Sequence, residues 1–433
     1  MKKFLILILT AFVSAAVNAE LVIEIEVGSA SAQPIAIVPF ANKNASPLPE
    51  DVSKIIANNL QRSGDFDTLP TSRMLGLPER FDQVHFRDWR RLGQSYIVVG
   101  SVTHQNGSKQ VIVDYELVDI FTQKSLISER VKASPTSLRK TAHYISDRVY
   151  QQITGVQGVF STKIAYITVK ELTNKQRQYR LNVADADGKG AYTLFTSREP
   201  MLSPSWSNDG QHLTYVSYDS GRPAIYIQHV ISGNQRKVTS FKGLNDSPMW
   251  SPDDSSLVMT LSKDGNAELY SYDLARDRTE RLTFDSGIDT EASWSQDGKS
   301  VVFTSDRGGS PQVYRMSLRD RIPERLSFVG KYNTRPRYSR DGNSIFYVHK
   351  STEPGDQGFH IAEIDIETGD QRILTSTSLD ESPSVSPNGR MIIYSTLRGG
   401  SKVLAVVSVD GGAKYFLPSN KGDVLEPAWS PFL

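Results

Sequence analysis

The sequence predicts a small N-terminal α/β domain followed by an all-β six-bladed β-propeller. Three observations carry this prediction: a leader at the start, alternating strand and helix patterns over residues 34–158, and a repeat of about 44 residues over residues 159–433. The length of 433 residues corresponds to roughly two or three domains. The sequence contains no cysteine, so packing rather than disulfide bonds must stabilise the fold.

The first 19 residues have the pattern of a secretory signal peptide. Lys2 and Lys3 form a short positive region, an apolar run follows over residues 4–13, and small side chains precede the bond between Ala19 and Glu20. We expect cleavage near that bond and export of the mature chain. The apolar run is too short to span a bilayer comfortably. The formal net charge of +1 gives no basic excess to attract nucleic acid or anionic lipid. No other apolar stretch approaches that length, so we also expect no direct membrane insertion.

Residues 20–33 form a separate strand-like tail. Ile23, Ile25 and Val27 alternate with Glu24 and Glu26, and this period of two is typical of a β-strand. Small residues over 28–32 indicate a flexible linker. A strand needs a partner for its backbone N–H and C=O groups. The pattern leaves two partners open, an edge of the following domain or a strand of another protein.

The α/β domain is predicted over residues 34–158. Apolar residues at helical spacing predict one helix over residues 52–60, ended by Gly64, and another over residues 138–153, ended by Gly155. Strands are predicted at residues 35–38, 96–100, 111–117 and 126–131, where apolar residues run together or alternate with polar ones.

The repeat is the strongest signal in the sequence. A Pro-x-Trp-Ser-like segment recurs six times with a large residue at its centre, at Trp206, Trp250, Trp294, Tyr338, Val385 and Trp429. A turn bearing Asp, Asn, Pro or Gly follows these segments, and further short strands complete each period. Four strands in about 44 residues is the period of a propeller blade. We expect the large central residues to pack between blades rather than to bind a ligand.

Both ends of the repeat indicate a closed ring. Strands at residues 164–169, 179–185 and 192–196 precede the first Trp-Ser segment without a leading strand of their own. The terminal segment Glu426-Pro427-Ala428-Trp429-Ser430 can supply that strand. Six segments then make six blades, and the ring has no open edge.

The leader, the strand-like tail, the α/β domain and the six blades together resemble the TolB family, the periplasmic component of the Tol-Pal envelope system of Gram-negative bacteria. Its most specific motifs are the Pro-x-Trp-Ser-Pro-Asp-Gly-like repeats and the terminal residues 426–433. The resemblance implies a non-enzymatic periplasmic scaffold that binds the lipoprotein Pal through one propeller face and TolA through the tail. It also implies a role in outer-membrane integrity and in constriction at cell division, and a propeller site that some toxins hijack. We expect a monomer.

The resemblance places the Pal contacts on polar loops at the channel mouth, just before the Trp-Ser segments. The expected Pal-binding residues are Asn245, Asp246, Ser247, Asp289, Thr290, Glu291, Asn333, Thr334, Arg335, Asp380, Glu381, Leu425 and Glu426. The expected TolA-binding residues are Glu20, Leu21, Val22, Ile23, Glu24, Ile25, Glu26 and Val27. For any single loop residue, the alternative is an ordinary solvated turn.

The sequence offers little for cofactor binding or catalysis. Carboxylates near the channel could hold Ca²⁺, which takes oxygen ligands, but no metal-binding motif accompanies them and we expect no cofactor. The sequence has no Gly-x-Ser-x-Gly elbow, no P-loop and no dinucleotide fingerprint. Its seven histidines show no metal-ligand spacing. An exported propeller hydrolase acting on peptides or glycans remains the alternative.

Overall fold

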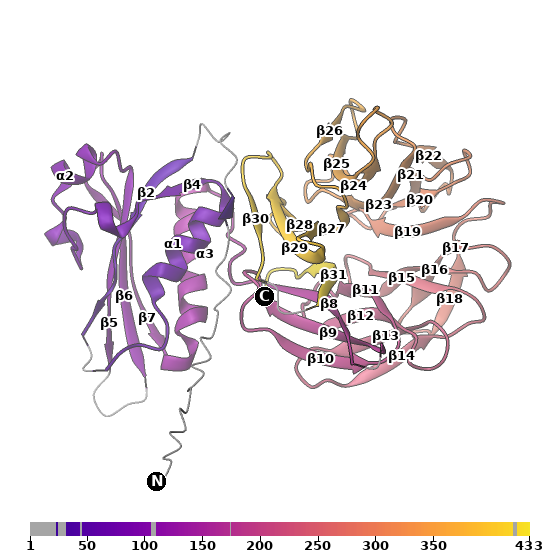
Figure 1. Cartoon of the computed structure of the whole chain (residues 1–433), viewed down its shortest axis with the longest axis horizontal. Helices are drawn as coiled ribbons and strands as arrows, with labels where there is room; N and C mark the ends of the chain where they lie inside the picture. Colours follow the sequence, from indigo (N-terminus) through magenta and orange to yellow (C-terminus); the bar gives the residue numbers. More distant parts are fainter. Residues whose placement is uncertain (1–22, 25–31, 44–45, 105–109, 174, 419–421) are drawn as a thin grey trace, which may run out of the picture.

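The computed structural model describes residues 23–24, 32–43, 46–104, 110–173, 175–418 and 422–433. It has a small domain of strands and helices beside a six-bladed β-propeller, which confirms the predicted fold class (Figure 1). The expected signal peptide and the tail apart from Ile23–Glu24 and residues 32–33 lie outside the described residues. In the described part of the chain, no helix is long and apolar enough to cross a membrane.

The α/β domain is built on a sheet with the strand order β4-β2-β5-β6-β7, in which β3 also pairs with β5. Its strands are β2 (Gln33–Ile37), β3 (Ala41–Asn42), β4 (Phe66–Thr68), β5 (Tyr96–His104), β6 (Val111–Asp119) and β7 (Lys124–Ala133). Its helices are α1 (Val52–Ser63), α2 (Phe86–Arg91) and α3 (Leu138–Thr154), with short 3₁₀ turns at Thr71–Arg73, Phe81–Gln83 and Pro135–Ser137.

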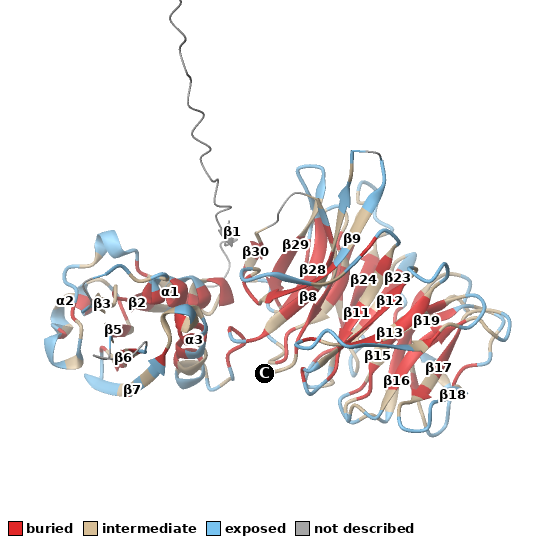
Figure 2. Ribbon diagram, turned by 90° about the horizontal axis from the view of Figure 1, so that it is seen from below, coloured by how far each residue is buried: buried red, intermediate tan, exposed pale blue. Residues whose placement is uncertain are grey.

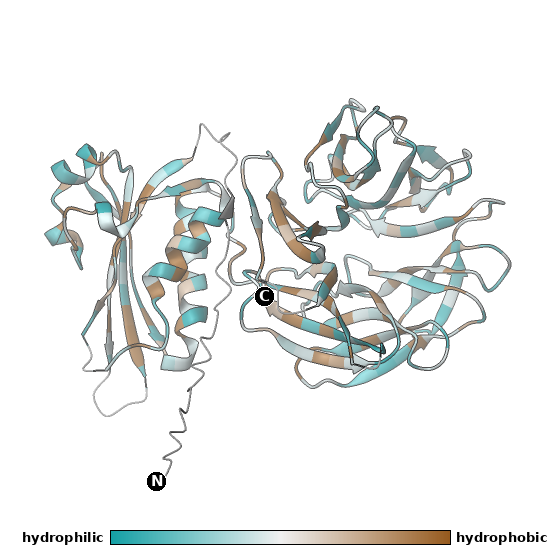
Figure 3. Cartoon of the chain, viewed as in Figure 1, coloured by the Kyte–Doolittle hydropathy of each residue, from teal (hydrophilic) through white to brown (hydrophobic). Residues whose placement is uncertain are grey.

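Two hydrophobic cores cover the two faces of this sheet. Helices α1 and α3 pack on one face, and hydrophobic residues of both helices and of β6 are visible in Figure 3. The segment that contains Trp89 covers the other face. Asp51 caps α1 by accepting a hydrogen bond from the Lys54 N–H at 3.0 Å, and Gly64 ends the helix with φ of 80°. Gly155 ends α3 in the same way with φ of 75°. Both helices are therefore as predicted.

Each propeller blade is an antiparallel four-stranded sheet, and blade 6 has an additional strand. Blade 1 contains β8 (Lys163–Glu171), β9 (Arg177–Asp185), β10 (Tyr192–Ser197) and β31 (Asp423–Trp429); blade 2 contains β11 (Met201–Trp206), β12 (His212–Ser217), β13 (Ala224–His229) and β14 (Gln235–Thr239); blade 3 contains β15 (Asn245–Trp250), β16 (Ser256–Leu261), β17 (Glu268–Asp273) and β18 (Arg278–Arg281). Blade 4 contains β19 (Asp289–Trp294), β20 (Ser300–Ser305), β21 (Gln312–Ser317) and β22 (Pro323–Arg325); blade 5 contains β23 (Tyr332–Tyr338), β24 (Ser344–Lys350), β25 (Phe359–Asp365) and β26 (Gln371–Ile373); blade 6 contains β27 (Glu381–Val385), β28 (Met391–Arg398), β29 (Ser401–Ser408) and β30 (Lys414–Phe416).

The repeated tryptophans pack between blades. Trp206, Trp250 and Trp429 are more than nine-tenths buried. The Trp206 indole N–H donates to the Ala428 carbonyl at 3.1 Å, and the Trp294 indole N–H donates to the Met249 carbonyl at 3.2 Å, so each bond joins two neighbouring blades. Buried residues run along the strands, whereas the loops at both ends of the blades are largely exposed (Figure 2). The interblade packing role expected for these residues is confirmed.

The last strand closes the ring. β31 pairs antiparallel with β8, with Trp429 opposite Ile164. The Ser430 N–H donates to the Lys163 carbonyl at 2.8 Å, and the Lys163 N–H donates to Ser430 Oγ at 2.9 Å. The Trp429 indole N–H also donates to Thr162 Oγ1 at 2.8 Å. The C-terminal end of the chain therefore completes the first blade.

The described part of the tail has a partner that the sequence pattern did not suggest. Strand β1 (Ile23–Glu24) pairs antiparallel with β30, with Ile23 opposite Tyr415 and Glu24 opposite Lys414. It thus extends the outer edge of blade 6. The sheet of the α/β domain does not include β1, so the expected alternative of an edge strand on the following domain is wrong.

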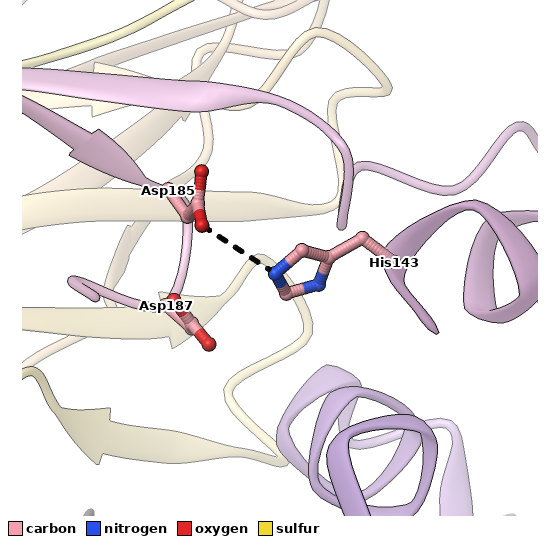
Figure 4. A group of neighbouring side chains, drawn as sticks. All are labelled: His143, Asp185 and Asp187. Atoms are coloured by element: carbon pink, nitrogen blue, oxygen red, sulfur yellow. Dashed lines mark ion pairs between the residues drawn. The ribbon is translucent and has the colours of Figure 1, made fainter. Parts of the chain in front are cut away.

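Charged side chains join the two domains. Arg139 of α3 and Arg62 of α1 approach two carboxylates at the end of β9 in blade 1. Arg139 Nε lies 3.3 Å from Asp185 Oδ2, and a second guanidinium nitrogen of Arg139 pairs with Asp187. Arg62 Nη1 lies 3.9 Å from Asp187 Oδ2. His143 points from α3 toward Asp185, with Nε2 3.8 Å from Oδ2 (Figure 4).

These ion pairs lower the pKa of the carboxylates. Burial raises the pKa of Asp187, but the Arg62 and Arg139 guanidinium groups outweigh it and hold that pKa below its ordinary value. Burial likewise raises the pKa of Asp185, whereas His143 and Lys163 lower it by a larger amount. A carboxyl group whose pKa is lower in the folded state stabilises the fold above its unfolded pKa and loses this contribution as pH falls through its folded pKa.

We expect Asp187→Asn to lower the free energy of unfolding by about 3 kcal/mol at pH 7, because it leaves the buried Arg62 without its carboxylate. The difference from the wild type should shrink below about pH 4, where the carboxyl of the unfolded wild type is protonated. Urea unfolding at both pH values measures this, with the exposed Asp320→Asn as the matched control. Equal stability of Asp187→Asn and the wild type at pH 7 would show that the interface does not depend on this pair.

Candidate functional site

A backbone irregularity recurs once in every blade at the channel. The innermost strand of each blade shifts register against its neighbour, as a β-bulge does. At each shift one non-glycine residue has φ between 49° and 59°. We call these residues the channel ring: Ser203, Ser247, Glu291, Arg335, Ser382 and Glu426. All six line the cavity along the propeller axis. The bulges therefore aim one side chain per blade into the channel.

Arg335 crosses the channel ring. Its Nε lies 3.1 Å from Glu291 Oε1 of blade 4, and its Nη1 lies 2.8 Å from Glu426 Oε1 of blade 1. It also bonds to Ser382 Oγ of blade 6. Burial raises the pKa of Glu426, but the attraction of Arg335 outweighs it and holds that pKa below its ordinary value. One guanidinium thus connects four consecutive blades across the channel.

Asp246 contributes a carboxylate of a different kind. It accepts hydrogen bonds from the Ser247 N–H at 2.7 Å and from Ser203 Oγ at 3.2 Å. Burial raises its pKa, and the nearby charges of Glu426 and Glu291 add to the rise. In the described structure Arg335 pairs with both glutamates and not with Asp246. The carboxylates of the ring therefore have a cationic partner, whereas the neighbouring carboxyl group of Asp246 is not paired with Arg335.

The structure divides the expected Pal-binding residues into two groups. The first residue of four loops is fully buried: Asn245, Asp289, Asn333 and Asp380. Asn245 accepts a hydrogen bond from the Phe241 N–H at 3.0 Å and donates to the Phe241 carbonyl at 2.8 Å, so it holds the interblade loop in place. The second group combines four residues of the channel ring that line the cavity with the residues that directly precede a ring residue. The former are Ser247, Glu291, Arg335 and Glu426, and the latter are Asp246, Thr290, Thr334, Glu381 and Leu425. For both groups, contact with a partner stays a prediction.

Three exposed phenylalanines lie in interblade loops at the same end of the propeller and were missed by the sequence analysis. Phe241, Phe284 and Phe328, which we call the aromatic arc, lie in the loops that lead into β15, β19 and β23. The exposed fractions of Phe284 and Phe328 are 70% and 71%. Each ring lies beneath a cation, with Lys263 5.6 Å, Arg281 4.8 Å and Arg325 5.0 Å from the respective centroids. The sequence does contain a signal for these residues. If the repeats are aligned through the loop after the outermost strand of blades 2 to 4, a Phe recurs there at nearly the spacing of the blades.

Two of the channel carboxylates that could hold Ca²⁺ already pair with an arginine. Arg335 pairs with Glu291 and Glu426, so a Ca²⁺ ion would have to displace a guanidinium. Within the described ranges, one group of three possible metal ligands was found, His143, Asp185 and Asp187 at the domain interface. Arg62, Arg139 and Lys163 pair with its carboxylates. The expected absence of a cofactor stays a prediction, and channel Ca²⁺ stays its alternative.

Known proteins share both halves of this architecture. The family model described as the TolB beta propeller domain matches residues 150–433, and that of the TolB amino-terminal domain matches residues 21–126. Tol-Pal system protein TolB of Hahella chejuensis is 57% identical over 433 residues, which cover all of both chains. The protein of the same description from Pseudomonas aeruginosa is 51% identical over 94% of this chain and 93% of its own.

A solved structure agrees with these relatives. The crystal structure of TolB from Acinetobacter baumannii covers 95% of this chain and 100% of its own, with 41% sequence identity and a TM-score of 0.86. The relatives form a non-catalytic family of periplasmic envelope proteins, so the alternative of an exported hydrolase is set aside. Full-length similarity, the two domain matches and the six-bladed ring lead to one conclusion: the chain belongs to the TolB family of the Tol-Pal system.

Proposed function

We propose that this chain is the periplasmic scaffold of the Tol-Pal system, which binds the lipoprotein Pal at the channel mouth and TolA through its N-terminal tail. In this role it supports outer-membrane integrity and constriction during cell division. The observation that carries the proposal is the combination of a charged channel ring with an exposed aromatic arc at the same end of the propeller.

The chemistry of this face supports a protein partner. Aromatic residues and arginines are enriched among the residues that dominate binding energy at protein interfaces. An arginine guanidinium lies over the ring of Phe284 and another over the ring of Phe328. A partner that covers these rings therefore buries apolar surface and contacts positive charge at the same place. The polar ring at the centre can then exchange hydrogen bonds with a segment that reaches into the channel. Membership of the Tol-Pal system supports Pal as this partner.

The pairing of the tail supports an exchange of partners. The ladder between β1 and β30 involves only Ile23 and Glu24 on the tail side among the described residues. So short a ladder costs little to open, because each hydrogen bond contributes about 1 kcal/mol net. The same backbone groups that pair with β30 can add to a strand of TolA instead. We therefore propose a tail that is docked on blade 6 or released to TolA.

The double variant Phe284→Ser with Phe328→Ser should weaken Pal binding by about 2 kcal/mol, roughly a 30-fold rise in Kd, because it removes two exposed aromatic contacts. Calorimetry with the soluble domain of Pal measures the change. Ile322→Ser is the matched control, since Ile322 is 74% exposed and lies between β21 and β22 at the opposite end of the blade. An unchanged Kd for the double variant would exclude the aromatic arc from the interface.

Deletion of residues 20–31 should abolish TolA binding and leave Pal binding unchanged, because the deletion stops before β2 and removes no residue of the channel ring. Pull-down with TolA measures the first effect, and calorimetry with the soluble domain of Pal measures the second. A chain in which a Gly/Ser segment of equal length replaces residues 20–31 controls for the length of the N-terminus. Retention of TolA by the deleted chain would refute the tail assignment.

A further inference from the structure

A cavity of about 230 Å³ lies along the propeller axis below the channel ring. It extends from the ring to the turns at the other end of the innermost strands, where Arg340 and Pro387 border it. Two positions after each ring residue, the innermost strands place one more layer of lining residues: Ser205, Met249, Ser293, Arg337, Ser384 and Ala428. Arg337 is the one charged side chain of this layer.

Arg337 has unused hydrogen-bonding capacity. A guanidinium offers five N–H donors. Among the described residues, the hydrogen bond found for this side chain runs from Nη1 to the Pro336 carbonyl at 2.8 Å, and no ion pair within 4.0 Å was found. Glu291 and Glu426 are close enough to attract it, but both pair with Arg335. The side chain therefore carries a positive charge into the cavity without a carboxylate in contact.

Arg337 is partly buried, and its environment keeps it charged. Burial lowers its pKa to about 10, while the charge of Glu291 acts in the opposite direction. The group is thus protonated at neutral pH. Removing a cation from water without pairing it is unfavourable, so an anion that enters the cavity gains more from Arg337 than it would from an arginine in solvent.

We infer that the cavity below the channel ring is a binding site for a single carboxylate group, held by the Arg337 guanidinium. The planar fork of arginine matches a carboxylate with two parallel hydrogen bonds. Ser205, Ser293 and Ser384 add hydroxyl groups to the same walls. The nearby Glu291 and Glu426 repel added negative charge, so a monoanion fits better than a dianion such as phosphate.

The carboxylate can come from a small free acid or from an acidic residue of an inserted peptide segment. Both carry the same chemistry to Arg337, and the cavity volume admits a side chain or a small molecule of a few heavy atoms. The site lies one layer below the channel ring, and the inference does not rest on the assignment of Pal or TolA as partners.

Calorimetry of the full chain with sodium acetate, and separately with a blocked glycine–aspartate–glycine tripeptide, tests the site at constant ionic strength. We expect the wild type to bind at least one of these probes, Arg337→Met to bind at least tenfold more weakly, and Arg337→Lys to fall between them. Arg340→Met is the matched control and should bind as the wild type does, because Arg340 is exposed at the cavity opening and hydrogen-bonds to Gln296 at 2.8 Å. No binding of either probe by the wild type, or equal binding by Arg337→Met, would overturn the inference.

Two further readouts separate the alternatives. Without ligand, Arg337→Met should unfold at a urea concentration no lower than the wild type, because it removes a desolvated cation that has no carboxylate in contact. A clear loss of stability would instead assign Arg337 a structural role and overturn the inference. Tighter binding of the tripeptide than of acetate, lost when its aspartate is replaced by asparagine, identifies an inserted segment as the source. Comparable affinities identify a small free acid.

Discussion

Six residues with positive φ, one in each blade, determine which side chains face the channel. A regular strand would alternate its side chains between the two faces of the sheet, and each bulge changes this alternation at the channel wall. A non-glycine residue in this region of backbone space costs on the order of 1–3 kcal/mol. Contacts with the preceding blade offset part of that cost: the Glu291 N–H donates to Thr260 Oγ1, and the Arg335 N–H donates to Glu291 Oε2. The backbone strain and the assembly of the blades therefore depend on each other.

Within each repeat, the residues that hold the blades together are different from the residues that give the channel its chemistry. The large residues at the centre of each segment pack between blades, where the interior is densely packed. The ring residue three positions earlier needs only the bulge geometry, and here it is serine, glutamate or arginine. The outer end of the same loop carries the exposed aromatic arc. A single structural unit thus repeats six times while its channel chemistry varies from blade to blade.

Much of the fold could be predicted because its signals are local. Apolar periodicity and terminal glycines defined α1 and α3, and the 44-residue spacing defined the blades. The six-residue helix α2 is too short to show a period. Pairing of β1 with β30 joins segments almost 400 residues apart, and no local pattern specifies such a partner. A polar loop residue gives the same pattern whether it is solvated or, like Asn245 and Asp380, buried as a support for its loop.

Closure by β31 has a consequence for the order in which the propeller forms. A chain is synthesised N-terminus first, so β8 is available long before residues 423–429. During that interval β8 presents an unpaired edge, and Arg335 lacks the partner that Glu426 provides. The closed channel can form only when residues 423–429 are available to pair with β8. A chain that ends before β31 would keep all the strands of blades 2 to 6 and still lack both the last strand of blade 1 and the Glu426 partner of Arg335, so the closed ring depends on the last strand to be made.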